Sequence, residues 1–168
     1  AVPEKQPWTI YAATGSGGLW KSVNNGTSWE PIFDNEAVIS IGDIAVAATD
    51  PKIVWVGTGE HTSSRSTYWG DGVYKSVDAG KTWTNMGLKN SQHIGRVIID
   101  PKDPNIVYVA SLGALYSQND ERGVYKTIDG GKTWIKSLEV KADGRMVGVA
   151  DLAMDPVNPK ILYAAAYD

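Results

Sequence analysis

The sequence predicts an all-β fold: a β-propeller of four-stranded antiparallel blades, with an incomplete set of about three blades in this chain. First, a twelve-residue phrase occurs three times, beginning at Gly18, Gly72 and Gly123, 54 and 51 residues apart. Second, short strand-like runs recur in step with this phrase. Third, 18 Gly and 8 Pro, with 7 Trp and 8 Tyr against one Phe, are typical of a turn-rich β protein. A repeat of this period buries its apolar faces only by stacking on its neighbours.

The middle repeat shows how one blade is built. Its first apolar run, Ile41–Ala47, is predicted to be a strand buried on both faces. Asp50 and Pro51 then mark a turn, because Asp before Pro favours turn formation. The remaining predicted strands of this blade are 53–57, 72–76 and one that begins at Thr82. No segment has helical periodicity over a useful length.

The other repeats contain the same strands. First strands are expected at 95–99 and 147–153, and second strands at 9–13, 106–110 and 161–165. The thirteen predicted strands divide a single propeller segment, 1–168, into the blade parts 1–36, 37–90, 91–146 and 147–168. Closed propellers have about four to eight blades. We therefore expect either a fragment of a larger propeller or self-association that covers the open strand edges.

The repeated phrase is predicted to fix a hairpin turn. Its Asp or Asn accepts hydrogen bonds from N–H groups two residues on, its Ser or Thr bonds the turn from the other side, and its Gly supplies a positive φ. Its Trp is expected to pack on its own or the next blade. We assign these residues a structural role: Ser22, Asn24, Gly26, Trp29, Ser76, Asp78, Gly80, Trp83, Thr127, Asp129, Gly131 and Trp134.

Composition excludes several function classes. The net charge is −3 with no Lys/Arg block, which argues against nucleic acid as a partner. No apolar stretch approaches membrane-spanning length, so membrane insertion is not expected. The chain has no cysteine and two histidines about thirty residues apart. We therefore predict no disulfide, no metal site and no cofactor.

Candidate binding residues lie on the face opposite the repeated turns, in the longer loops 58–71, 89–93, 111–122 and 136–145. Loops on a rigid scaffold are the usual place for binding. The candidates are Glu60, His61, Arg65, Tyr68, Trp69, His93, Tyr116 and Arg122.

Each candidate also has a structural interpretation. Glu60 is a weak catalytic candidate that could do acid–base work with His61, or it bonds backbone N–H groups while His61 is solvated. Trp69 either stacks on a sugar or peptide side chain, or folds back over the blade. His93 closes the loop before a central strand, and Arg122 forms an ion pair with Glu121.

The repeated phrase is similar to the Asp-box, or BNR, repeat, Ser/Thr-x-Asp-x-Gly-x-x-Trp, from which the first copy departs at Asn24. Longer stretches resemble a bacterial family of large exported proteins described as sortilin-related or glycosyl-hydrolase-like. These stretches are 40–47, 55–60, 70–76, 93–97 and 121–126. The resemblance implies a multi-bladed propeller in a secreted or periplasmic bacterial protein.

Two main functions follow from this resemblance. The first is a non-catalytic binding or scaffold module that recognises a peptide, protein or glycan. The alternative is part of a secreted glycoside hydrolase whose catalytic groups lie partly outside this segment. Asp-box propellers that cleave xyloglucan carry an Asp after a Tyr-Ala-x-Thr strand end, where this chain has Gly15. Sialidases open with an Arg-Ile-Pro segment that this chain lacks. A third possibility is an assembly factor.

Overall fold

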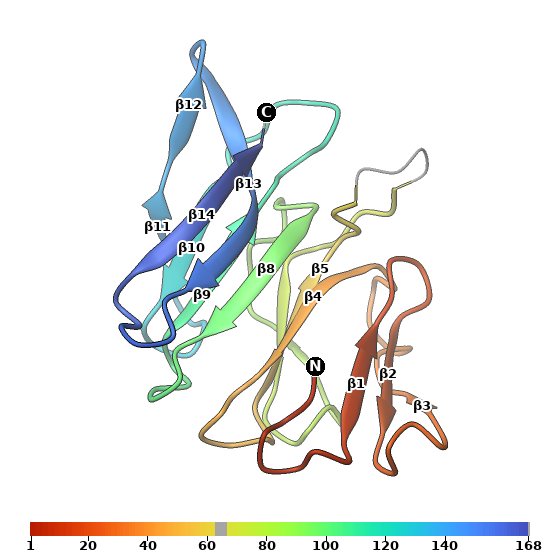
Figure 1. The fold of residues 1–168 in the computed structure, drawn as a ribbon. Coiled ribbons are helices and arrows are strands. Elements are labelled where there is room, and N and C mark those ends of the chain that lie inside the picture. Colours follow the sequence, from red (N-terminus) through yellow and green to blue (C-terminus); the bar gives the residue numbers. More distant parts are fainter. Residues whose placement is uncertain (63–66, 168) are drawn as a thin grey trace.

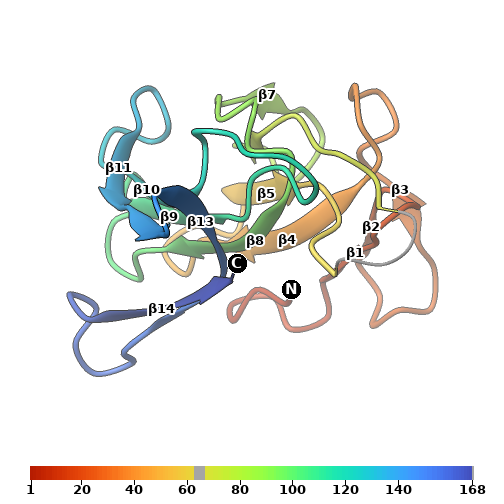
Figure 2. The same cartoon turned by 90° about the horizontal axis from the view of Figure 1, so that it is seen from above.

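The computed structural model describes residues 1–62 and 67–167. All regular secondary structure within these residues is β-strand. These strands form four antiparallel sheets that stand side by side along an arc (Figures 1 and 2). The middle two sheets have four strands each and the outer two have three. The prediction of an all-β, incomplete propeller of antiparallel blades is confirmed.

The strands follow chain order within the first three sheets. The first sheet contains β1 (Ile10–Ala13), β2 (Leu19–Ser22) and β3 (Glu30–Pro31). The second contains β4 (Ile41–Val46), β5 (Val54–Thr58), β6 (Val73–Ser76) and β7 (Thr84–Asn85). The third contains β8 (Ile94–Ile99), β9 (Val107–Ser111), β10 (Gly123–Thr127) and β11 (Ile135–Leu138). The fourth contains β12 (Val140–Ala142), β13 (Arg145–Met154) and β14 (Leu162–Tyr167), in the order β12-β13-β14.

The strands β4, β8 and β13 line the inner side of the arc (Figure 2), and two glycines let them come close. A Cβ on Gly42 would lie 2.0 Å from the Ile94 carbonyl oxygen, and one on Gly95 would lie 1.9 Å from that of Ala150. Both glycines sit at β-bulges, where one residue has no partner on the adjacent strand. Only a residue without a side chain fits at such a contact.

The apolar core lies between neighbouring sheets. Trp55 of β5 and Val107 of β9 belong to one cluster, which Ile94 of β8 joins. The expectation that Ile41–Ala47 is buried on both faces is wrong: β4 is mostly half-buried, whereas all five residues of β5 are buried. The reason is position, because β4 faces the open inner side of the arc and β5 lies between two strands of its own sheet.

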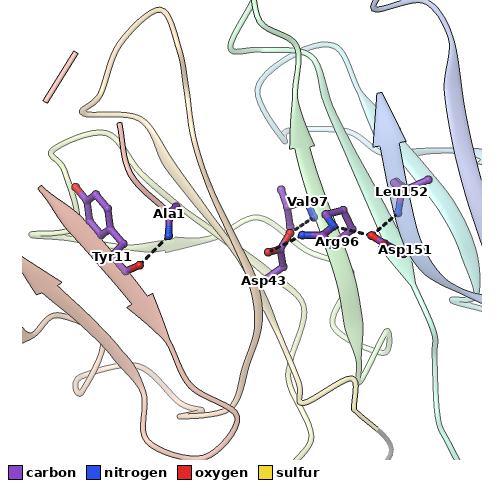
Figure 3. A network of polar contacts seen from close by, with 7 residues as sticks. All are labelled: Ala1, Tyr11, Asp43, Arg96, Val97, Asp151 and Leu152. Carbon is purple, nitrogen blue, oxygen red and sulfur yellow. Dashed lines mark hydrogen bonds and ion pairs between the residues drawn. The ribbon is translucent and has the colours of Figure 1, made fainter. Parts of the chain in front are cut away.

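The two outer sheets leave apolar surface uncovered. Strand β14 occupies the place of β5 and β9 but is exposed along most of its length, with Tyr163 62% exposed. At the other end, Ala1 exchanges two backbone hydrogen bonds with Tyr11, at the edge of β1 where other sheets have an inner strand (Figure 3). Both outer sheets therefore lack the partners that the middle blades have.

The repeated turns share one hydrogen-bonding pattern, shown by the second copy. The Ser76 hydroxyl oxygen accepts from the N–H groups of Asp78 and Gly80, and Asp78 Oδ1 accepts from the N–H groups of Lys81 and Thr82. The prediction that the Asp carboxylate accepts from the N–H group two residues on is wrong. The Ser76 hydroxyl accepts from the N–H two residues after it, and the Asp78 carboxylate accepts from the N–H groups three and four residues after it. The positive φ of Gly80 is confirmed.

The tryptophans of the repeated turns pack backward along the chain. Trp83 Nε1 donates to the Ile32 carbonyl at 2.7 Å, and Trp134 Nε1 donates to the Met86 carbonyl at 2.7 Å. The Trp83 ring also lies against Gly80 of its own turn, as expected, whereas the contact across blades is with the preceding blade and not with the next one. No sheet among the described residues precedes that of Trp29, which is 40% exposed. Trp83 and Trp134 each join their blade to the one before it.

The structure contains one hairpin that the sequence analysis does not predict. Residues 136–145 are predicted to be a loop, but β11, β12 and the start of β13 occupy most of it. Asp143 and Gly144 both have positive φ, 50° and 76°, which is typical of a two-residue hairpin turn. The Asp-Gly pair between alternating residues was the signal for this hairpin. It projects from the face opposite the repeated turns (Figure 1).

The substitution Gly95→Ala tests the close approach of the inner strands. Its methyl group would overlap the Ala150 carbonyl, so β8 and β13 would have to separate. We expect a loss of about 1–3 kcal/mol in the free energy of unfolding, measured by urea denaturation. The control is Gly17→Ala, whose methyl group would meet only the Thr14 side chain. An equal loss in both variants would contradict this account.

Candidate functional site

The repeated turns and the variable loops lie on opposite faces of the arc (Figure 1). On the turn face, the Ala79 N–H donates to the Lys52 carbonyl and the Gly130 N–H donates to the Asn105 carbonyl. These bonds join each repeated turn to the turn between the first two strands of its blade. The other face carries the loop after β5, the segment before β8 and the loop after β9. The candidate site lies on this face.

A groove of about 520 Å³ on the loop face lies between the segment before β4 and the loop before β6. Three large apolar side chains line it with high exposure: Ile39 (49%), Tyr68 (53%) and Trp69 (68%). The Ser40 hydroxyl donates to the Tyr68 carbonyl at 3.0 Å and thereby joins the two walls. The exposure of Trp69 rules out the interpretation that its ring folds back over the blade.

Glu60 lies at the base of the same loop. Its N–H donates to the Tyr68 carbonyl, and its own carbonyl accepts from the Thr67 hydroxyl. The Thr62 hydroxyl donates to Glu60 Oε1 at 2.8 Å. The carboxylate is directed toward Gly15 of the preceding blade, where a Cβ would lie 3.1 Å from Glu60 Cδ. The predicted interpretation in which this carboxylate bonds backbone N–H groups is not what these contacts show.

His93 is a buried loop-closing residue, as its structural interpretation predicts. Its side chain is 1% exposed, and Nδ1 lies 2.9 Å from the Gly113 carbonyl oxygen. A carbonyl only accepts, so Nδ1 carries the proton of the neutral ring. Burial lowers the pKa of His93, and the smaller effects of the Gly113 carbonyl and Glu60 raise it. His93 therefore supports the site and does not contact a ligand directly.

A row of charges that sequence analysis missed crosses the inner strands (Figure 3). Arg96 of β8 lies between Asp43 of β4 and Asp151 of β13. Its NH1 is 3.5 Å from Asp43 Oδ1, and its Nε donates to Asp151 Oδ1 at 2.7 Å. Each of the three follows a β-bulge, so they occupy equivalent positions in successive blades. That equivalence was the available signal.

The two carboxylates of this row have opposite electrostatic environments. Burial raises the pKa of Asp43, and the Val97 N–H and the Arg96 guanidinium oppose this more weakly. The hydrogen bond from Arg96 lowers the pKa of Asp151, which is more exposed. His61 lies near enough to lower both pKa values slightly. His61 of the predicted Glu60–His61 pair is therefore near the row of inner-strand charges.

The other predicted candidates separate from this site. Arg122 is buried and donates to the carbonyls of Ala114, Ser117 and Met146, so it stabilises its own loop and is not an accessible binding residue. Glu121 Oε2 accepts from the Asn90 N–H at 2.9 Å, and its ion pair with Arg122 stays a prediction. Tyr116 lines a different hollow of about 390 Å³. Arg65 lies outside the described residues.

Within residues 1–62 and 67–167, no group of three or more His, Asp or Glu side chains could hold a metal ion. The same part of the chain contains no helix long and apolar enough to cross a membrane.

Curated relatives of this chain are xyloglucan-degrading enzymes. No protein-family model matches the chain. A xyloglucanase of Hypocrea jecorina is 27% identical over 157 residues, 85% of this chain and 18% of that protein. An oligoxyloglucan-reducing end-specific xyloglucanase of Emericella nidulans is 29% identical over 109 residues, 62% of this chain and 13% of that protein. The chain spans less than a fifth of the length of these two relatives.

Solved structures share the fold over almost the whole chain. An ancestral GH74 enzyme has a TM-score of 0.76 at 24% identity, covering 99% of this chain and 21% of its own. The GH74 xyloglucanase from Xanthomonas campestris has a TM-score of 0.74 at 17% identity, covering 99% of this chain and 26% of its own. These structures support the propeller fold, and the xyloglucanase relatives support the glycosyl-hydrolase-like part of the sequence resemblance. The Asp-box and sortilin-related assignments stay predictions.

These comparisons correct the main function predicted from sequence. A non-catalytic binding or scaffold module is the wrong preference, because the curated relatives are hydrolases. The alternative, part of a glycoside hydrolase with groups outside this segment, agrees with relatives several times longer than this chain.

The buried His93 predicts a pH-dependent stability. Its folded pKa is below the unfolded value near 6.5, so the unfolded chain binds the proton more readily. Stability is therefore retained above about pH 6.5 and falls as the pH drops through the folded pKa. We expect the urea midpoint to decrease between pH 7.5 and 5, and His93→Gln to flatten this decrease. His61→Gln is the matched control. If His61→Gln flattens the decrease of the urea midpoint and His93→Gln does not, the assignment to His93 is refuted.

Proposed function

We propose that this chain forms blades of a glycoside hydrolase that acts on xyloglucan or a related β-glucan. The observation that carries the proposal is the similarity of the sequence to three xyloglucanases, which extends over as much as 94% of the chain. The fold shared with GH74 enzymes agrees with it. The enzymatic reaction needs a pair of carboxyl groups, and we place part of that machinery in other blades of a longer propeller.

The groove beside β4 is the proposed sugar-binding surface. A sugar ring presents apolar C–H faces that pack on exposed aromatic rings, and Trp69 and Tyr68 offer such rings side by side on one loop. Ser40 and Thr67 also line the groove, and their hydroxyls donate to the Tyr68 and Glu60 carbonyls, which holds its walls in place. Few polar groups among apolar ones is the usual character of a small-molecule site.

The uncovered surface of β14 supports a larger assembly. Strands in its position in the middle blades are buried between two partners, whereas β14 pairs only with β13 in the described residues. We propose that further blades of a longer propeller cover it. Secretion of that longer protein fits a polysaccharide substrate and stays part of the proposal. A bacterial source has no support from the curated relatives, which include Hypocrea jecorina and Emericella nidulans.

The test is hydrolysis and binding by the full-length protein. Reducing-sugar release should be seen with xyloglucan and be much weaker with unsubstituted cellulose oligosaccharides. Trp69→Ala should raise KM about fivefold or more, because stacking on an aromatic ring contributes about 1 kcal/mol or more.

The matched control is Trp29→Ala, which removes another exposed tryptophan on the turn face. This variant should keep the KM of the unaltered protein. Absence of turnover on every β-glucan tried would refute the proposed function, and equal effects of the two variants would refute the position of the groove.

A further inference from the structure

We propose that Glu60 is one of the two carboxyl groups that hydrolyse the glycosidic bond, and that it works from the neighbouring blade over Gly15. This inference rests on the proposed glycan function and assigns a residue to it. The observation is the contact between blades: Glu60 Cδ and Oε1 lie 3.1 and 3.3 Å from the position that a Cβ on Gly15 would occupy. The carboxylate thus fills the side-chain space of a residue on another blade.

Main-chain hydrogen bonds connect both Glu60 and the Gly15 connection to the walls of the proposed sugar groove. Gly15 belongs to the connection between β1 and β2, and this connection is bonded to a groove wall at both ends. The Ile41 N–H donates to the Thr14 carbonyl, and the Gly18 N–H donates to the Ile39 carbonyl. On its own side, Glu60 is bonded through its main chain to Thr67 and Tyr68 of the other wall. Glu60 therefore sits where the two walls and the Gly15 connection meet.

The carboxylate is held in a defined orientation. The Thr62 hydroxyl donates to Oε1 at 2.8 Å, which restricts the orientation of the carboxylate. His93 is buried beneath the loop and hydrogen-bonds the Gly113 carbonyl. Its Nε2 lies 3.4 Å from the Thr67 hydroxyl, and this hydroxyl donates to the Glu60 carbonyl. A preorganised acceptor beside a binding groove is what general-base catalysis requires.

The reaction step balances with a second carboxyl group. A water molecule attacks the anomeric carbon and gives its proton to the Glu60 carboxylate. The bond from this carbon to the glycosidic oxygen breaks, and the leaving oxygen takes a proton from the second group, a protonated carboxylic acid on a blade outside this chain. Water is the only other reactant, and one hydroxyl forms on each product.

The contact with Gly15 allows a relocation experiment. Gly15 does not have a positive φ, so residues other than glycine fit its backbone conformation. The three heavy atoms nearest to a Cβ there all belong to the Glu60 side chain. In the double variant Glu60→Ala/Gly15→Asp, the new carboxylate therefore starts from the place that the old one has left.

The test measures kcat on xyloglucan with the full-length protein. Glu60→Gln should lower kcat at least a hundredfold, with oligosaccharide binding and the thermal unfolding temperature nearly unchanged. Glu60→Ala/Gly15→Asp should recover at least tenfold over Glu60→Ala, and Glu60→Ala/Gly15→Asn, equal in shape but without the charge, should not. Glu4→Gln, at an exposed glutamate, is the control for the substitution itself.

Each outcome decides a separate claim. A Glu60→Gln protein that keeps more than a third of its kcat would overturn the role of Glu60 and leave the proposed glycan hydrolysis intact. If Glu60→Gln unfolds, the relocation pair decides, because recovery with Asp but not with Asn requires a carboxylate at that point. Equal recovery with both, or with neither in folded proteins, would overturn the inference. No turnover by the unaltered protein would refute the proposed function as well.

Discussion

The structure depends on the close approach of successive inner strands. Gly42 and Gly95 bring each inner strand against a backbone carbonyl of the next, at distances that no Cβ would allow. At the residue after each bulge, Asp43, Arg96 and Asp151 then join three blades through charge. The tryptophans of the repeated turns act at the opposite edge of each blade, where they donate to carbonyls of the blade before. Blade-to-blade geometry is thus fixed at both edges, and the loops between strands are free to differ.

This division of roles explains why the residues that recur in the three turns do not form the proposed catalytic site. In the turns, Asp78 accepts from the hydroxyl and N–H of Thr82, and these bonds lower its pKa to about 2. A carboxylate with its acceptor sites engaged by its own turn is poorly suited to proton transfer with a substrate. Asn24 keeps the same turn with no charge at all, since its Oδ1 accepts from the Ser28 N–H. Glu60, in a loop that occurs once, has a carboxylate directed at another blade.

Sequence alone was sufficient for the fold class and for nearly every strand, because turn residues and apolar runs recur at blade spacing. It placed Glu60, Tyr68 and Trp69 on one loop correctly, but it gave Arg122 and His93 a binding role although both are buried. Burial of such residues depends on which carbonyls the loops bring near, and spacing carries no information about that. The Glu60–Gly15 contact and the charge row likewise join residues of different blades. The β12 hairpin could have been found from Asp143 and Gly144.

The central claim is that the loop face holds the sugar, with Glu60 beside the bond to be broken. The most direct measurement is a crystal structure of the full-length Glu60→Gln protein with a bound xyloglucan oligosaccharide. The account predicts a sugar ring stacked on Trp69 in the groove beside Ile39, with an anomeric carbon that faces residue 60 across the space of one water molecule. An oligosaccharide bound on the face of the repeated turns, with this groove unoccupied, would contradict it.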